Sequence, residues 1–356
     1  MRPVASFTIA HTEIVRADGS LAGKLPAFAE SRAELVRLYR GMVLTRAFDA
    51  KAVGLQRTGR LGTFPSSLGQ EAVVVGVAAA MHAEDVLLPS FRELGAQLWR
   101  GVTLVETLSY WGGDERGSCF TGPREDFPIS VPVGTQAPHA VGVALAFKLR
   151  DEPRVAVCVF GDGASSKGDV YEAMNLAGAW QLPVVFVINN NEWAISVPRR
   201  AQSAAETLAQ KAVAAGFPGE QVDGNDVIAV RTVLERALGR ARRECLPSLV
   251  EALTYRLSDH TTADDARRYR DDAEVSERWK AEPIARMRNF LVERGWWTKG
   301  DEERLLQECA AEIDAAVEAY LAVASAPPTD AIDHVFAALP EPMARQRAAL
   351  VTGEPS

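Results

Sequence analysis

Two oxygen-bearing side chains that could bind a metal follow consecutive apolar runs of the chain. Asp162 stands between two glycines directly after "VAVCVF" at 155–160, and Asn191 follows "LPVVFVINN" at 182–190. Short apolar runs rich in β-branched residues are typical of strands buried on both faces. If the two strands are parallel neighbours, a right-handed crossover brings both turns to the same carboxyl edge of the sheet.

Oxygen ligands of this kind suit Mg²⁺, which is usually held by one or two carboxylates together with phosphate oxygens. Asp162, the amide oxygen of Asn191 and one backbone carbonyl would supply three ligands. Two diphosphate oxygens and a water would complete an octahedron. Glycines at such a turn let the backbone approach a phosphate. We therefore predict that Asp162 does not face the phosphate but holds the cation that bridges to it.

Two other phosphate motifs begin with similar glycines, and neither is complete in this chain. A dinucleotide fingerprint needs a third glycine where Ser166 stands, and no ribose-binding acid ends the next strand. A P-loop starting at Gly163 would need a lysine after Gly168, but Asp169 follows. The remaining alternative is a plain turn, which does not explain the asparagines at the matching strand end.

The elements that must position these turns alternate regularly between strand and helix. We expect a short strand just before residue 222, and longer strands at 85–91, 155–160, 182–190 and 247–256. Strands that alternate with helices indicate a parallel sheet with helices on both faces. The predicted fold class is α/β, with a mostly parallel, doubly wound sheet.

Helices are expected before, between and after these strands. The segment 31–58 has apolar residues at helical spacing and opens with a capping box of Ser31 and Glu34. Further helices are expected at 67–81, 139–150, 169–180, 205–216 and 227–243. The loop 112–136 is rich in Gly and Pro, and a loop this long inside a domain tends to be functional.

The chain divides into three predicted parts: an irregular N-terminal arm at 1–30, an α/β domain with leading helices at 31–270, and a C-terminal helical extension at 271–356. The extension has helical periodicity from residue 302. One apolar face of this helix is expected to consist of Leu305, Leu306, Cys309, Ile313, Ala316, Val317 and Tyr320.

Composition excludes several classes of protein. The net charge is −8 and no long Lys/Arg cluster occurs, which argues against non-specific nucleic-acid binding. The four cysteines are far apart without a CxxC pair, so reduced thiols are expected. No secretory signal is visible, and the longest apolar stretches are too short to span a bilayer. We expect a cytoplasmic protein.

The Gly-Asp-Gly turn with its downstream asparagines resembles the motif of thiamine diphosphate (ThDP) enzymes. From about residue 31 to 295 the chain is similar to the α subunit of the E1 component of 2-oxo acid dehydrogenase complexes, most closely the bacterial pyruvate type and then the branched-chain type. The similar stretches are "RLGTFPSSLGQEA", "LLPSFRELG", "VPVGTQ", "GDGASSKGDVYEAMNLAGAWQLP", "NNNEWAISVP", "TLAQKAVAAGFPGEQVDGND" and "DHTTADDARRYR".

This resemblance implies roles for individual residues. The Trp193 carbonyl becomes the third Mg²⁺ ligand beside Asp162 and Asn191. Arg92 matches an arginine that pairs with a diphosphate oxygen, which suits a guanidinium fork. Phe91 stands where the family usually has Tyr, so that hydroxyl contact is lost. The other implied cofactor positions are Gly163 and Ala164 at the diphosphate, Val131 and Val133 near the aminopyrimidine, and Ser196.

Three further assignments follow from the same resemblance. His260 matches the active-site histidine that meets the reaction intermediate and the incoming lipoyl group, and an imidazole can donate or accept a proton near pH 7. The alternative for His260 is an ordinary surface-loop histidine. Phe64 matches a residue of the substrate pocket. A structural K⁺ site is implied at Ser130, Pro132, Thr135 and Gln136.

The resemblance also implies that the chain carries only part of an active site. ThDP enzymes activate the cofactor's aminopyrimidine with a glutamate from a second α/β domain, and only one sheet-forming block, at about 85–260, is present. We therefore expect an α2β2 heterotetramer in which a β subunit donates that glutamate, and acyl transfer to a lipoyl-bearing E2 core. The expected substrate is pyruvate, with branched-chain 2-oxo acids as the alternative. A non-catalytic ThDP-binding scaffold is the alternative of another class.

Overall fold

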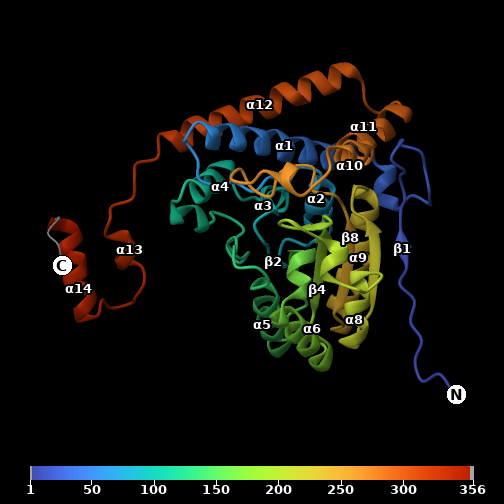
Figure 1. Cartoon of the computed structure of the whole chain (residues 1–356), viewed down its shortest axis with the longest axis horizontal. Helices are drawn as coiled ribbons and strands as arrows, with labels where there is room; N and C mark the ends of the chain where they lie inside the picture. The colour runs from blue at the N-terminus through green and yellow to red at the C-terminus, as the bar shows by residue number, and fades with distance from the viewer. Residues whose placement is uncertain (1, 353–356) are drawn as a thin grey trace.

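A six-stranded sheet forms the centre of the computed structural model, which describes residues 2–352 (Figure 1). All its strand pairs are parallel, in the order β1-β7-β8-β4-β3-β2. The strands are β1 (His11–Thr12), β2 (Val86–Leu88), β3 (Ala156–Gly161), β4 (Val184–Asn190), β7 (Gly219–Asp223) and β8 (Ser248–Leu253). The predicted parallel, doubly wound sheet is confirmed.

Helices cover both faces of the sheet because successive residues of each strand point their side chains to opposite sides. Along β3, Val157 and Val159 pack into the cluster under α2 and α9, whereas Ala156, Cys158 and Phe160 pack under α5 and α6. These helices are α2 (Glu71–Ala80), α5 (Gln136–Leu149), α6 (Gly168–Trp180) and α9 (Val227–Glu244).

The remaining elements lie outside these layers or in the connections. Helices α1 (Arg32–Arg57) and α11 (Pro283–Glu293) pack against α2, and α12 (Lys299–Leu321) packs along α1 and α4. The others are α3 (Leu94–Arg100), α4 (Leu104–Trp111), α7 (Arg199–Gln202), α8 (Lys211–Ala214), α10 (Asp272–Arg278), α13 (Asp330–Asp333) and α14 (Glu341–Thr352). A small antiparallel pair consists of β5 (Trp193–Ala194) and β6 (Val197–Pro198), and short 3-10 turns include η3 (Asp162–Ser166) and η4 (Leu208–Gln210).

The direction of the connections places a switch point between β4 and β8. The chain moves across the sheet from β2 through β3 and β4 to β7, then returns to insert β8 beside β4. Because such crossovers are right-handed, reversing the direction moves the connecting helix to the other face. Accordingly, α5 and α6 cover one face and α9 covers the other. Ligands of open α/β sheets bind at such a point.

Several segments differ from the sequence-based expectation, among them the strand expected at 85–91, which is reduced to β2, and the helix expected from 139, which begins at Gln136. Helix α2 begins at Glu71 rather than 67, because Ser66 and Ser67 instead bind the buried carboxylate of Asp49. The expected helix 205–216 is reduced to η4 and α8. The N-terminal arm is not wholly irregular, since β1 pairs with β7 at the sheet edge.

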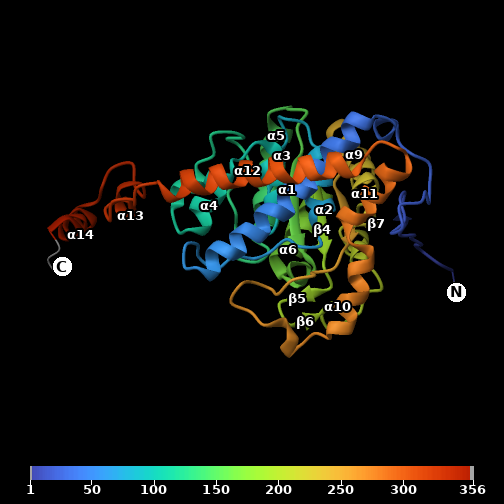
Figure 2. The same ribbon diagram turned by 90° about the horizontal axis from the view of Figure 1, so that it is seen from above.

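The C-terminal extension packs along α1 as far as the end of α12 (Figure 2). Of the apolar face expected for α12, Leu305, Cys309, Ile313 and Val317 are buried, but Leu306 is 49% exposed. Beyond α12, α13 and α14 project away from the rest of the molecule, and α14 has no buried residue (Figure 1). Ser31 caps α1 through the Glu34 N–H; the reciprocal half of the expected capping box is replaced by a Glu34–Arg231 ion pair.

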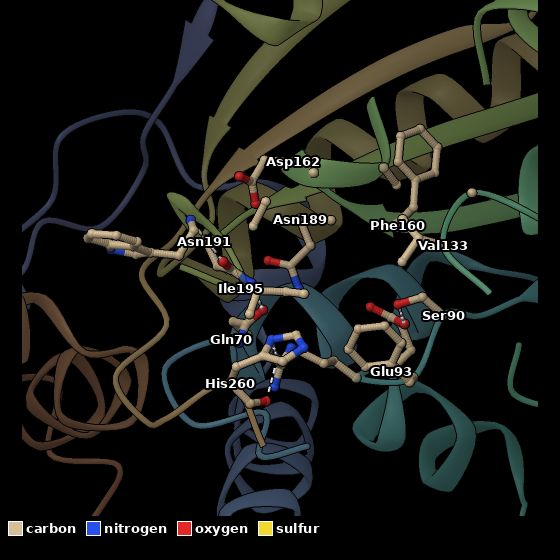
Figure 3. Close-up of a pocket in the computed structure, with 18 of the residues that line it drawn as sticks. Gln70, Ser90, Glu93, Val133, Phe160, Asp162, Asn189, Asn191, Ile195 and His260 are labelled. Atoms are coloured by element: carbon tan, nitrogen blue, oxygen red, sulfur yellow. Dashed lines mark hydrogen bonds between the residues drawn. The ribbon is translucent and has the colours of Figure 1, made fainter. Parts of the chain in front are cut away.

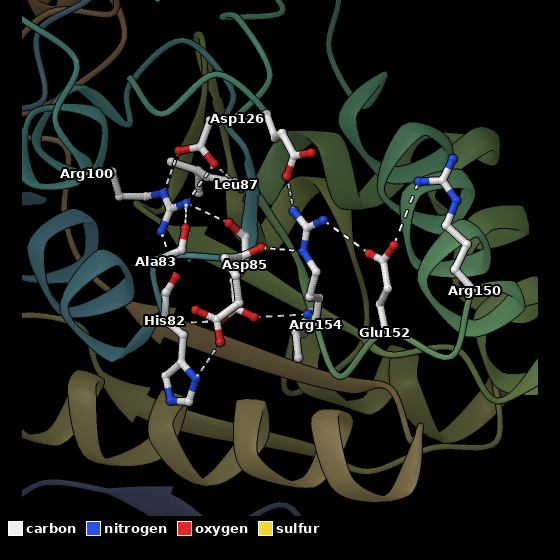
Figure 4. A network of polar contacts seen from close by, with 12 residues as sticks. His82, Ala83, Asp85, Leu87, Arg100, Asp126, Arg150, Glu152 and Arg154 are labelled. Carbon is white, nitrogen blue, oxygen red and sulfur yellow. Dashed lines mark hydrogen bonds and ion pairs between the residues drawn. The ribbon is translucent and has the colours of Figure 1, made fainter. Parts of the chain in front are cut away.

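A polar network fixes the opposite, amino end of β2 and β3 (Figure 4). The buried Asp85 accepts hydrogen bonds from the backbone N–H of Val155 and from the Arg242 guanidinium. Arg100 pairs with Asp126, which also accepts the Leu87 N–H. Buried charges need such partners, and these interactions stabilise the amino ends of β2 and β3. The carboxyl ends of the strands lie at the opposite edge of the sheet. Within residues 2–352, no helix is long and apolar enough to cross a membrane.

Candidate active site

A cavity of about 210 Å³ opens at the carboxyl ends of β3 and β4 (Figure 3). The parallel register pairs Gly161 with Asn189, so the turns after the two strands lie side by side. The third wall is the segment that follows β2. The predicted site residues that line this cavity are Phe91, Arg92, Val133, Gln136, Asp162, Gly163, Ala164, Asn191, Trp193 and His260.

Asp162 begins the 3-10 turn η3 and is almost completely buried, with 2% of its surface exposed. Its Oδ2 accepts a hydrogen bond of 3.1 Å from the Gln202 amide, and within residues 2–352 it forms no salt bridge. Burial raises the pKa of the Asp162 carboxyl to about 6. A buried carboxylate without an ion pair is costly, and a bound cation would remove that cost.

Asn191 and Trp193 lie beside Asp162 in the same wall. The Asn191 Oδ1 accepts the Trp193 N–H at 3.2 Å, and its Nδ2 donates to Gln70 Oε1 at 3.0 Å. The Trp193 carbonyl accepts a hydrogen bond of 3.3 Å from the buried Arg256, so one of its lone pairs remains. One carboxylate, one amide oxygen and one carbonyl are oxygen donors of the kind that Mg²⁺ takes.

The rest of the cavity wall fits an anion beside such a cation. Gln70 Nε2 and Asn189 Nδ2 are buried donors without a partner among the described residues. A Cβ on Gly161 would meet no atom within 4 Å, so this part of the wall leaves space. A Cβ on Gly163 would lie 2.7 Å from the Ala194 Cβ, so only glycine allows the turn to approach β5. Donors and open space together suit phosphate oxygens.

No cluster of three or more His, Cys, Asp and Glu side chains that could hold a metal occurs within the described part of the chain. The proposed metal ligands around Asp162 do not need such a cluster. They include a single carboxylate, and the other oxygens come from the Asn191 amide and the Trp193 backbone carbonyl. Such a set is one that Mg²⁺ uses when substrate phosphates complete its shell.

Arg92 and His260 form a tight pair at the opposite wall, although 168 positions separate them. The Arg92 Nη2 lies 2.8 Å from His260 Nδ1 and 2.7 Å from the His260 carbonyl, and Nη1 donates to the Ser66 carbonyl at 2.5 Å. Since a guanidinium only donates, His260 Nδ1 is the acceptor and the ring proton is on Nε2.

The surroundings of this pair shift the pKa values of both side chains. Burial, followed by the charges of Arg92 and Arg256, lowers the pKa of His260 to about 4. Burial also lowers the pKa of Arg92 to about 10, so it remains a cation at neutral pH. At pH 7 His260 is therefore a neutral ring that offers an Nε2–H donor.

Comparison with known proteins decides the family. A model of the dehydrogenase E1 component matches residues 39–328. The chain belongs to the dehydrogenase E1 component family. It is 42% identical over 333 residues to the 3-methyl-2-oxobutanoate dehydrogenase subunit alpha of Mycobacterium tuberculosis, which covers 93% of this chain and 89% of the relative.

Relatives that are named as pyruvate dehydrogenase subunits are nearly as similar to this chain. The pyruvate dehydrogenase E1 component subunit alpha of Acholeplasma laidlawii is 42% identical over 79% of this chain and 81% of its own. The protein of the same name from Staphylococcus aureus is 39% identical over 88% of this chain and 85% of its own. The predicted resemblance to E1 α subunits is confirmed, and this family depends on thiamine diphosphate.

The remaining predicted positions of this E1 chain lie outside the cavity wall. Val131 is 52% exposed, and Ser196 lies on the loop between β5 and β6. Phe64 is buried against Trp111, and its backbone is bonded to Thr262, two residues after His260.

The predicted K⁺ loop has one notable acceptor. Gln136 donates from Nε2 to the Ser130 carbonyl at 3.0 Å, and its buried Oε1 has no partner among residues 2–352. Thr135 and Pro132 are joined by a backbone hydrogen bond in the same turn. An unpartnered buried oxygen beside a turn of carbonyls is compatible with a cation.

Sequence reasoning missed several residues that line the cavity: Gln70, Ser90, Glu93, Gly134, Phe160, Gly161, Asn189, Ala194 and Ile195. Many of them are adjacent in the sequence to predicted site residues, and this adjacency could have indicated them. Gln70 is different, because it comes from a segment far from both strand ends. Only the stretch "SLGQEA" that contains it gave any indication.

Proposed function

We propose that this chain is the half of a 2-oxo acid dehydrogenase that anchors the diphosphate of ThDP through Mg²⁺. The proposed ligands are Asp162, Asn191 and the Trp193 carbonyl. The observation that carries this proposal is the buried Asp162 carboxylate, which has no salt bridge among the described residues and lies beside two unpartnered amide donors. A divalent cation and its diphosphate would supply the missing partners for both.

Other residues of the chain are proposed to bind and orient the cofactor. The backbone of Gly163 and Ala164 contacts the diphosphate, and Arg92 adds a cationic fork. When bound, ThDP supplies a carbon nucleophile and an electron sink for decarboxylation of a 2-oxo acid. His260 presents its Nε2–H to the cavity, where it would donate a hydrogen bond.

The partners follow from what the chain lacks. As an E1 α subunit it works with a β subunit. We place the glutamate that activates the aminopyrimidine on this β subunit, in an α2β2 heterotetramer, and the acyl acceptor on a lipoyl-bearing E2 core. Val131 and Val133, 52% and 47% exposed beside the cavity, are proposed to contact the aminopyrimidine. All four cysteines are free, which suits a cytoplasmic enzyme.

A second cation is proposed in the loop that precedes α5. The unpartnered Gln136 Oε1, with oxygens of Ser130, Pro132 and Thr135, would hold K⁺ and so fix the loop that carries Val131 and Val133. K⁺ should then raise the thermal stability of the assembled enzyme more than Na⁺ does, and Gln136→Met should remove that difference.

Pyruvate is the proposed substrate, with branched-chain 2-oxo acids as the second candidate. The second candidate is retained because the relative that covers 93% of the chain carries the name 3-methyl-2-oxobutanoate dehydrogenase. Co-expression with a β subunit, followed by comparison of turnover on pyruvate and on 3-methyl-2-oxobutanoate, tests the assignment. Faster turnover of pyruvate supports it. Absence of turnover on every 2-oxo acid, with ThDP still bound, would instead indicate a non-catalytic scaffold.

A further inference from the structure

Gln70 occupies an unusual position at the start of α2. It is the N-cap residue of this helix, but its side chain does not cap the helix and none of its surface is exposed. Short polar side chains are preferred at N-caps, and a buried amide needs partners elsewhere. The Gln70 side chain lines the cavity beside Asn191, far in sequence from both strand ends (Figure 3).

The contact that Gln70 makes there determines the orientation of an amide. Its Oε1 accepts the Asn191 Nδ2 at 3.0 Å, while the Trp193 N–H donates to Asn191 Oδ1 at 3.2 Å. An amide has a donor end and an acceptor end, and only the acceptor end can bind a cation. With an acceptor at one end and a donor at the other, Asn191 is held in a single orientation.

We propose that Gln70 is a positioning residue, which holds Asn191 with its oxygen toward the cation site and keeps its own Nε2 for an oxygen of the bound cofactor. This inference rests on the proposed function. The Nε2 atom supports it, because it is buried, lines the cavity and has no partner among the described residues. One side chain thus meets both the metal ligand and the anion that the metal binds.

Gln70→Met tests the first contact, because methionine has a similar length but no amide. Without Oε1 the Asn191 Nδ2 is a buried donor without a partner, a penalty that corresponds to about tenfold in an equilibrium constant. In the assembled enzyme at saturating ThDP, the Mg²⁺ concentration for half-saturation should rise about tenfold. Tryptophan fluorescence, which includes the adjacent Trp193, reports this binding independently of activity.

Gln70→Glu separates the two contacts. It keeps an acceptor oxygen for Asn191 but loses the Nε2 donor, so half-saturation by Mg²⁺ should stay near that of the wild type. Calorimetry at saturating Mg²⁺ should instead show weaker ThDP binding. If Gln70→Met does not assemble, Gln70→Glu alone decides: a Mg²⁺ half-saturation about tenfold higher than in the wild type would overturn the proposal.

A change at the metal ligand excludes a merely structural effect. Asn191→Asp has oxygen at both ends of the side chain, so no orientation remains for Gln70 to set. Gln70→Met should therefore leave half-saturation by Mg²⁺ unchanged in that background, and a persistent tenfold effect would overturn the proposal. The matched control is Gln97→Met, at another buried glutamine that lies outside this cavity, which should titrate like the wild type.

Asp162→Ala distinguishes failure of this inference from failure of the proposed function. If Asp162→Ala loses Mg²⁺-dependent ThDP binding while Gln70→Met titrates like the wild type, the role of Gln70 is wrong and the proposed function stands. If Asp162→Ala itself binds normally, the cation site is wrong and the role of Gln70 falls with it.

Discussion

At the scale of single residues, the site combines features that the sequence predicts with contacts that it does not. Asp162 and Asn191 could be found because neighbouring parallel strands must bring their carboxyl ends together. The Arg92–His260 pair and the Gln70–Asn191 pair could not be found, because 168 and 121 positions separate their members. Contacts across such distances depend on packing, which residue types and spacing do not specify.

The pKa of His260 leads to a prediction about pH. In the folded chain His260 takes up a proton only near pH 4, whereas the unfolded chain does so near its ordinary value of 6.5. The unfolded state therefore binds more protons between these values, and His260 makes the protein less stable as pH falls from 6.5 toward 4. His260→Gln lacks this contribution. The melting temperature of His260→Gln should rise relative to that of the wild type as pH is lowered from 7 to 4.5.

Scanning calorimetry of both assembled enzymes at several pH values measures this difference. A gap between the two melting temperatures that stays constant from pH 7 to 4.5 would mean that His260 ionises normally in the folded state. Its Nδ1 would then not be held by Arg92.

At the scale of elements, the sheet was predictable and several helix boundaries were not. Strands β3, β4 and β8 are buried on both faces, which leaves an apolar run in the sequence. The start of α2 depends on the hydrogen bonds that Ser66 and Ser67 make with Asp49, a residue of another helix. The edge strand β1 has only two residues and no pattern of its own.

Close approach of two elements gives a test of the packing around α6. A Cβ on Gly178 would lie 1.9 Å from the Ala215 carbonyl oxygen, so this helix touches the backbone after α8. Gly178→Ala should therefore lower the free energy of unfolding by about 1–3 kcal/mol, as overpacking does. Urea unfolding of the chain measures the effect.

Gly54→Ala is the matched control, because Gly54 lies in α1 and its Cβ would meet nothing within 4 Å. That change should stabilise the chain by about 0.5–1 kcal/mol, as expected for Gly to Ala inside a helix. If Gly178→Ala behaved like Gly54→Ala, the close packing of α6 would be wrong.

At the scale of the whole molecule, we propose that the single sheet carries one half of a cofactor site. The cavity offers ligands for a cation and donors for a diphosphate at the ends of β3 and β4. Helices α13 and α14 extend beyond the body that contains this site (Figure 2). The resemblance to ThDP enzymes, together with a single sheet-forming block, predicts that this site is incomplete. The path of the C-terminal helices was not predictable from their apolar pattern.

The half-site predicts that the purified chain has no decarboxylase activity alone. Turnover should appear only when a β subunit is added and should saturate at equal amounts of the two subunits. Release of CO₂ from the 2-oxo acid, measured during such a titration, checks this. Full turnover by the chain without its partner would show that the activating group lies within it.

The central claim is that Asp162 holds the cation that binds the cofactor's diphosphate. Calorimetry of ThDP binding to the assembled enzyme, with and without Mg²⁺, tests it most directly. Asp169→Ala, at an exposed aspartate of the same segment, is the control and should bind like the wild type. Asp162→Ala should lose the Mg²⁺-dependent binding. Wild-type affinity in Asp162→Ala, with the same dependence on Mg²⁺, would contradict the account.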